Sequence, residues 1–224
     1  METALIQTIL FFLLVAFVPS IIWVIWLVKR SETILSPSSI LIMFFWGAIF
    51  AVIIAVVMEI LIPGYSPREI ASSAFFGAVV IAPITEEFAK PLGIRFAERD
   101  ISSLNDGIIL GATAGLGFAA TENLLYELVA LGQGGWGAFW ATALLRSFAA
   151  CALHASATAL TGQGYARASI GGRSWVSIIP FYLLAVILHG LYNYLAISGS
   201  FLYFLMAMVL ALGAILFTRY SASN

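Results

Sequence analysis

The stretch DGIILGATAGLGFAATENLLYELV, residues Asp106–Val129, is apolar enough to cross a bilayer, yet it carries regularly spaced glycines and an acidic side chain beyond them. Gly107, Gly111 and Gly115 recur every four residues, a spacing that lets a second helix approach closely. Glu122 follows Gly115 by seven residues and therefore lies on nearly the same helix face. Helix packing explains the glycines, but it does not explain a carboxylate that points into the bundle.

The whole chain shares this apolar character. Of its 224 residues, 62% are hydrophobic and 9% are charged, and the mean hydropathy is +1.05. Soluble domains carry about a quarter charged residues, so the composition predicts a protein whose solvent is lipid. The formal charge of -1 identifies no partner, and we expect no nucleic acid among the partners. A single cysteine, Cys151, excludes an internal disulfide.

Seven apolar stretches of about 20 residues, the length that spans a bilayer, predict an all-α fold: a polytopic membrane helix bundle that forms one domain over residues 1–224. The stretches are Ala4–Val28, Ser39–Ile62, Ala71–Phe88, Asp106–Leu131, Trp136–Gly162, Trp175–Ile197 and Ser200–Thr218. No basic segment precedes the first stretch, so we expect a retained helix rather than a cleaved signal peptide. The predicted location is the plasma membrane, as an integral membrane protein.

The basic residues of the connections gather on one side of this predicted bundle. That side holds Lys29, Arg30, Lys90, Arg95, Arg99, Arg167, Arg173 and Arg219. The opposite side holds Arg68 alone. Because cytoplasmic loops carry the excess of Lys and Arg, the asymmetry predicts an N-terminus outside the cell and a cytoplasmic C-terminus, which agrees with seven spans.

Few ionisable side chains lie within the apolar stretches, and such side chains must face the interior of the bundle. They are Glu59, Glu86, Glu87, Glu122, Glu127, Arg146, His154 and His189, joined by the neutral amide of Asn193. In IAPITEEFAKP, residues Ile81–Pro91, Glu86 and Lys90 are four apart and could form an ion pair on one helix face. Glu87 is then left without a partner in the sequence.

Two further stretches each contribute a histidine. His154 belongs to a polar stripe, and a histidine in such a stripe is more often a hydrogen-bonded structural residue than a ligand. His189 and Asn193 are four apart and share a helix face. Carboxylates and imidazoles on four separate helices predict one convergent site. We expect Arg146 to lie outside that site and to pair with Glu127 or Glu59.

Two kinds of chemistry fit these residues, and both predict hydrolysis of an amide. Two histidines and a carboxylate could hold a catalytic zinc with one position left for water, and we assign this ligand set to Glu122, His154 and His189. Without a metal, Glu86 could act as the general base while His189 and Asn193 stabilise the oxyanion. The sequence leaves the choice between the two open.

The main alternative is a proton- or ion-coupled transporter or channel, because buried Glu and His residues also build proton relays. Two features favour a fixed catalytic site instead. The two halves of the chain show no inverted repeat, which many transporters have. The adjacent Glu86 and Glu87 beside Lys90 suit a fixed site better than a permeation path.

Four motifs in family order resemble the PrsW family of intramembrane proteases. They are EEFAK (Glu86–Lys90), FAATEN (Phe118–Asn123), His154 and HGLYN (His189–Asn193), within a core of about residues 71–197. The family belongs to a superfamily with the CAAX prenyl endopeptidases and the bacteriocin-processing proteases. Glu122 and Pro91 stand where CAAX-type members usually carry histidine and arginine, which argues against prenylated substrates.

The resemblance implies roles for individual residues. It implies catalytic roles for Glu86, Glu87, Glu122, His154, His189 and Asn193, with supporting roles for Lys90, Phe118 and Asn123. It also implies a membrane-anchored protein substrate, because PrsW relatives are associated with cleavage of anti-sigma factors outside the membrane. Zinc is compatible with this reading but is not required by it.

Overall fold

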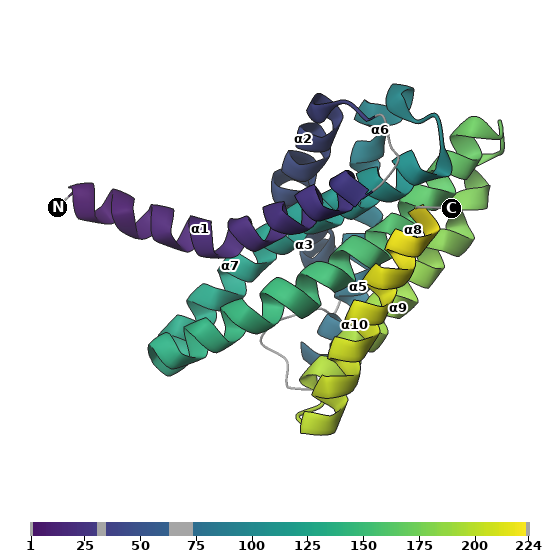
Figure 1. The fold of residues 1–224 in the computed structure, drawn as a ribbon. Coiled ribbons are helices and arrows are strands. Elements are labelled where there is room, and N and C mark those ends of the chain that lie inside the picture. Colours follow the sequence, from purple (N-terminus) through teal and green to yellow (C-terminus); the bar gives the residue numbers. More distant parts are fainter. Residues whose placement is uncertain (1, 31–34, 63–73, 223–224) are drawn as a thin grey trace.

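A computed structural model describes residues 2–30, 35–62 and 74–222, and all regular elements in these ranges are helical. The α-helices are α1 (Glu2–Arg30), α2 (Pro37–Phe45), α3 (Val52–Leu61), α5 (Ala82–Ala89), α6 (Ile94–Ala97), α7 (Leu104–Leu145), α8 (Cys151–Ile170), α9 (Ile179–Ile197) and α10 (Phe201–Ala222). Three π-helical segments continue or join them, at Trp46–Ala51, Gly77–Ile81 and Arg146–Ala150. The predicted all-α class is confirmed (Figure 1).

Five helical runs in the described residues are long and apolar enough to cross a membrane. They are Thr3–Lys29, Pro37–Leu61, Leu104–Ile170, Trp175–Ile197 and Phe201–Thr218. The third of these runs has 67 residues and contains two of the predicted stretches, because the chain turns back on itself near Gly135 (Figure 1). Gly135 has a φ of 68°, a conformation that glycine adopts without strain.

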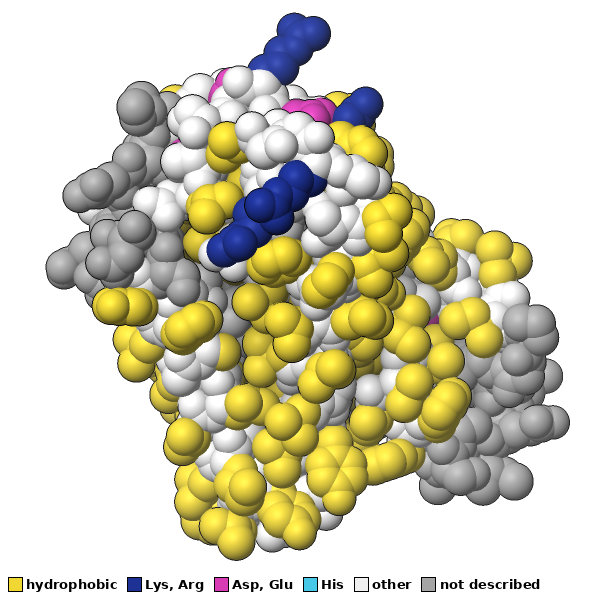
Figure 2. Space-filling model, turned by 90° about the vertical axis from the view of Figure 1, so that its right-hand side faces the viewer, with side chains coloured by type: hydrophobic (Ala, Val, Ile, Leu, Met, Phe, Trp, Pro, Cys, Tyr) yellow, Lys and Arg dark blue, Asp and Glu magenta, His cyan; other side chains and the backbone are white. Residues whose placement is uncertain are grey.

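A membrane-embedded helical protein is therefore supported, while the count of seven spans stays a prediction. The predicted stretch Ala71–Phe88 begins at residues 71–73, which lie outside the described residues, as does Arg68. Arg95, Arg99, Arg167 and Arg173 are exposed, as the predicted cytoplasmic side requires, but Lys90, which we counted on that side, is completely buried. Orientation also stays a prediction. In Figure 2, Lys and Arg gather at the upper end of a surface that is otherwise mostly hydrophobic.

The glycine spacing of α7 sets a close backbone contact with α8 near the candidate site. A methyl group added at Gly107, Gly111 or Gly115 would overlap a backbone carbonyl oxygen of α8. Those carbonyls belong, in the same order, to Gly162, Thr158 and His154. The α8 number falls as the α7 number rises, so the two helices are antiparallel. This backbone contact fixes His154 of α8 at the level of Gly115, two helical turns before Glu122.

The third predicted stretch ends later than the sequence indicates. We placed its end at Phe88, but the helical run continues through Lys90–Gly93 and α6 to Asp100. Pro91 does not end the run, because it occupies one of the first positions of a 3-10 turn, where a backbone N–H is not needed. Glu86 therefore lies near the middle of a continuous helical run instead of at its end.

Hydrogen bonds to Asp100 fix the far end of that run. The hydroxyls of Ser39 and Ser36 donate hydrogen bonds to the Asp100 carboxylate, and these bonds lower the pKa of Asp100 below its usual value. Closer to the site, Trp46 Nε1 donates to the carbonyl of Ala89 at 3.2 Å. The run that carries Glu86 is thus attached at both points to the helical run that leads to α3.

Candidate active site

Lys90 occupies the centre of the candidate site, and its side chain is completely buried. Its Nζ donates to Glu86 Oε2 at 3.0 Å and to Glu87 Oε1 at 2.8 Å. The same nitrogen lies 2.8 Å from His154 Nδ1. The ring of Phe118 closes the remaining side, with its centroid 4.2 Å from Nζ. The predicted ion pair of Glu86 and Lys90 is present, and the ammonium serves the second glutamate and a histidine as well.

Glu87 has partners that lie far away in the sequence. Its Oε1 lies 2.9 Å from His189 Nδ1, and its Oε2 accepts a hydrogen bond from the Thr158 hydroxyl at 3.0 Å. A carboxylate on one nitrogen of a histidine orients the ring and leaves the other nitrogen free for chemistry. That other nitrogen, Nε2 of His189, lies 3.9 Å from Glu86 Oε2. Glu87 thus orients His189 toward Glu86.

His154 links the two glutamates of different helices. Its Nε2 lies 2.8 Å from Glu122 Oε2, and its Nδ1 lies 3.9 Å from Glu86 Oε2. Because a lysine ammonium can only donate, Nδ1 of His154 accepts from Lys90 and the Nε2–H donates to Glu122. The ring centroids of His154 and His189 are 4.9 Å apart. The helices therefore bring together the residues predicted to converge, which are Glu86, Glu122, His154 and His189.

Arg146 belongs to this site, contrary to our expectation. Its guanidinium pairs with Glu122, and its Nε donates to Asn123 Oδ1 at 2.8 Å. The expected pairing with Glu127 or Glu59 is wrong, and the helix register gives the reason. The antiparallel register that sets Gly115 against His154 also brings position 146 opposite position 123. Glu127 lies one turn further along, where it is buried and has no hydrogen-bond partner among the described residues.

Asn193 lies at the edge of the site rather than at its centre. Its Nδ2 donates to the carbonyl of Ala78 at 2.8 Å, which ties α9 to the π-helical segment Gly77–Ile81. Asn123 lies behind Glu122, with its amide nitrogen 3.5 Å from Cys151 Sγ. These contacts give both amides a role in positioning helices around the carboxylates.

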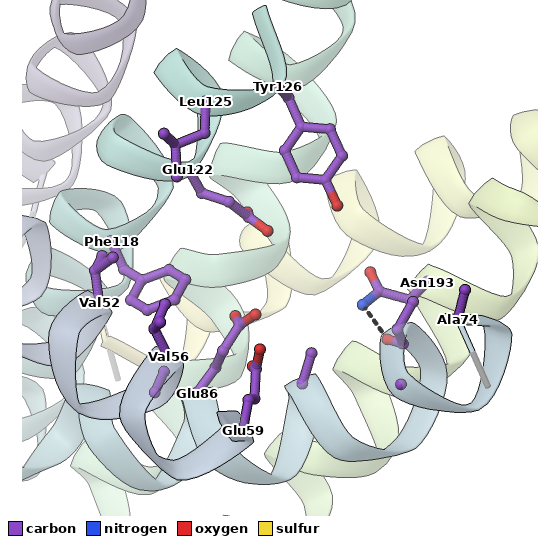
Figure 3. A pocket seen from close by; sticks show the side chains of 14 residues that line it. Val52, Val56, Glu59, Ala74, Glu86, Phe118, Glu122, Leu125, Tyr126 and Asn193 are labelled. Atoms are coloured by element: carbon purple, nitrogen blue, oxygen red, sulfur yellow. Dashed lines mark hydrogen bonds between the residues drawn. The ribbon is translucent and has the colours of Figure 1, made fainter. Parts of the chain in front are cut away.

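A cavity of about 280 Å³ opens beside Glu86. It is lined by Val52, Ala55, Val56, Glu59, Ala74, Gly77, Ala78, Ala82, Glu86, Phe118, Glu122, Leu125, Tyr126 and Asn193. Figure 3 shows the carboxylates of Glu59, Glu86 and Glu122 pointing into it. The sequence identifies Glu59 as an ionisable residue in an apolar stretch, and we expected it as one of two partners for Arg146. That signal was sufficient to find it, but nothing in the sequence placed it beside Glu86.

A metal ion could be held by Glu86, His154 and His189, whose ligand atoms all lie within 4.8 Å of one another. This set differs from the predicted one, because the Glu122 carboxylate is engaged by Arg146 and by His154 Nε2. One carboxylate and two imidazoles suit a catalytic zinc, so the residue types fit the ion. Lys90 contacts two of the three residues, and its ammonium therefore competes with any metal for them.

Residues 36–217 match the profile of a family described as PrsW family intramembrane metalloprotease. The chain belongs to the PrsW family. It is 28% identical over 170 residues to Protease PrsW of Geobacillus kaustophilus (strain HTA426), covering 72% of this chain and 68% of that protein. It is 30% identical over 116 residues to Protease PrsW of Clostridioides difficile (strain 630), covering 50% of this chain and 49% of that protein.

The chain thus spans about half the length of the second of these PrsW relatives. No solved structure matches the chain significantly. All the residues of the candidate site, from Glu59 to Asn193, lie within the region that matches the PrsW family.

Proposed function

We propose that this chain is a membrane-embedded endopeptidase that hydrolyses a peptide bond of a membrane-anchored protein, with water activated by Glu86. The observation that carries the proposal is the position of Glu86. Its carboxylate lines the cavity, Lys90 holds it at 3.0 Å, and both His154 and His189 approach it to 3.9 Å. A general base needs a fixed carboxylate that a water molecule can reach, and Glu86 meets both conditions.

The neighbouring residues divide the remaining work. Glu87 is withdrawn from the cavity and orients His189, while Glu122 fixes the tautomer of His154. Lys90 keeps the charge of the two adjacent glutamates balanced as Glu86 takes up and releases a proton. Asn193 keeps the cavity wall in place through Ala78. If zinc were held by Glu86, His154 and His189, it would polarise the substrate carbonyl and acidify a water molecule, and a carboxylate other than Glu86 would then take the proton of that water.

The depth of the site supports cleavage near one face of the membrane. The Thr85 hydroxyl donates to Glu59 Oε1 at 3.0 Å, which sets Glu86 at the level of Glu59. Glu59 lies close to the end of α3 at Leu61, after a helical run from Pro37 that is long enough to cross the bilayer. In the predicted orientation this end faces outside the cell. We therefore propose cleavage at the outer boundary of the plasma membrane, where an anti-sigma factor is a suitable substrate class.

The test is cleavage of single-spanning peptides in proteoliposomes by the wild type and by Glu86→Gln. General-base catalysis contributes about 10² to 10⁴ in rate, so we expect Glu86→Gln to lose at least about 100-fold. Glu98→Gln is the matched control, because Glu98 lies outside the site and pairs with the exposed Arg95. Equal cleavage by Glu86→Gln and Glu98→Gln would exclude Glu86 as the base. Proton flux without any cleavage would favour the transporter alternative.

A further inference from the structure

The three carboxylates that face the cavity differ in their counter-charges. Glu86 is paired with Lys90, and Glu122 is paired with Arg146. Glu59 has a hydrogen bond from the Thr85 hydroxyl, and within the described residues no Lys, Arg or His lies within ion-pair distance of its carboxylate. Among the described residues, Glu59 is therefore the carboxylate of the cavity wall that has no counter-charge, while Glu86 shares Lys90 with Glu87.

The hydrogen bond from Thr85 compensates this charge only in part. The Thr85 hydroxyl lies 3.0 Å from Glu59 Oε1 and also 3.1 Å from the carbonyls of Ile81 and Ala82. A hydroxyl has one proton, so these three acceptors share a single donor. A carboxylate within the membrane region is unfavourable unless a cation or several donors face it. The cavity consequently favours a positively charged guest at Glu59.

The walls around Glu59 suit a long side chain with an apolar stem. Ala55 and Val56 lie one helical turn before Glu59 on α3, and both line the cavity. Across from them, Ala74 and Gly77 leave space, because neither carries a side chain larger than a methyl group. Lysine and arginine bury their methylene stems against apolar walls and keep their charged ends with a polar partner.

We propose that Glu59 forms a subsite for a lysine or arginine side chain of the substrate, next to the bond that is cut. The subsite adjoins Glu86 in the same cavity (Figure 3), so the basic residue lies close to the reacting peptide. The proposal rests on the proposed protease function for its location relative to the cleaved bond. The preference for a basic side chain rests on the charge of Glu59 alone.

Binding and cleavage are measured separately so that the two proposals can fail independently. The probes are single-spanning peptides in nanodiscs whose outer juxtamembrane segment carries one lysine at successive positions among serine and alanine. A second set has methionine, and a third has glutamate, in place of the lysine. Binding is measured with the Glu86→Gln protein, which keeps the subsite, and cleavage is measured with the wild-type site. Glu98→Gln is the matched control in both.

We expect at least one lysine peptide to bind about tenfold more tightly than its methionine partner, as for a partly desolvated charge pair. Adding Glu59→Gln removes this preference for lysine, and adding Glu59→Lys instead makes the glutamate peptide the tighter binder. The control Glu98→Gln leaves the preference for lysine unchanged. No lysine preference at any position, or a preference that survives Glu59→Gln, overturns the subsite. A loss of bound zinc in Glu59→Gln with unchanged peptide binding also overturns it, because Glu59 would then be a metal ligand.

Cleavage of the same peptides tests the proposed protease function. Lysine-dependent binding without any cleavage keeps the subsite and removes the protease function. Cleavage that ignores the lysine keeps the protease function and removes the subsite.

Discussion

Lys90 Nζ donates a hydrogen bond to His154 Nδ1 across 2.8 Å, between two residues that are far apart in the sequence. The same ammonium holds Glu86 and Glu87, so one cation pairs with two carboxylates and orients one imidazole. The contact also determines the tautomer of His154, because Nδ1 must accept, and Nε2 must then carry the proton and donate the hydrogen bond to Glu122. Lys90 is therefore the cation shared by the two adjacent glutamates, as Arg146 is the cation of Glu122.

Replacing Lys90 by methionine should turn this site into a stronger metal site. The substitution leaves Glu86, Glu87 and His154 without their cation, which lowers stability by about 3 to 5 kcal/mol, as for the loss of one partner of a buried ion pair. A divalent cation can then take the vacated position and restore stability through binding. We expect zinc to raise the melting temperature of Lys90→Met more than that of the wild type. An identical response of the two proteins would show that Lys90 does not compete with metal.

Arg146 should affect turnover more than substrate affinity. It fixes the Glu122 carboxylate, which in turn fixes His154, and the loss of such an outer partner lowers activity about 10- to 100-fold. We expect Arg146→Met to lower kcat with little change in KM, and Arg146→Lys to recover part of the loss. Arg95→Met is the matched control, because Arg95 forms an exposed pair with Glu98. A change in KM alone, or no recovery with lysine, would contradict this positioning role.

A single methyl group at Gly115 should disturb the site through the backbone. The new Cβ of Gly115→Ala would overlap the His154 carbonyl, so α7 and α8 must separate at that level. Overpacking of this kind costs about 1 to 3 kcal/mol, and we expect both a lower melting temperature and reduced cleavage. Gly132→Ala in the same helix is the control, because nothing lies within 4 Å of the position of its added Cβ. If Gly115→Ala behaves like Gly132→Ala, the close contact is absent in the membrane.

Removing the carboxylate of Glu127 should stabilise the protein. Both of its oxygens are buried, and neither has a hydrogen-bond partner in the part of the chain that the structure describes. A buried polar group that lacks its bonds costs about 1 to 3 kcal/mol. We expect Glu127→Leu to raise the melting temperature in nanodiscs, while Glu98→Leu at the surface leaves it nearly unchanged. A lower melting temperature for Glu127→Leu would indicate that the carboxylate has a partner in the membrane.

The sequence was informative where a residue type alone carries the signal. Glycines at every fourth position predicted that a second helix packs closely on this one, and that helix is α8. The ionisable residues in apolar stretches predicted one convergent site. Relations that depend on helix register could not be predicted in this way. The partner of Arg146 follows from the antiparallel register of α7 and α8, which no pattern within one helix contains. Glu59 lies beside Glu86 because its carboxylate accepts a hydrogen bond from Thr85. Thr85 belongs to a helical run that only tertiary packing brings alongside α3.

The end of the third stretch was misplaced for a related reason. A run of apolar residues was expected to end where charges appear, at Glu86 and Glu87. These charges do not end the helix, because Lys90 of the same helical run pairs with both glutamates. Trp46 also donates a hydrogen bond to the carbonyl of Ala89. Buried charged side chains that pair with one another can lie in the middle of a membrane helix.

The burial of Glu86 sets a condition on the conformation of a substrate. A peptide carbonyl within a helix is already bonded to the N–H four residues further along and is surrounded by the side chains of its own turn, whereas Glu86 lies in the wall of a cavity and is 6% exposed. Under the proposed function, a membrane anchor must unravel locally before one of its peptide bonds reaches Glu86. Glycine makes a helix about 1 kcal/mol per residue less favourable than alanine does. Cleavage would then depend on how readily a segment loses its helical structure before any side chain is recognised.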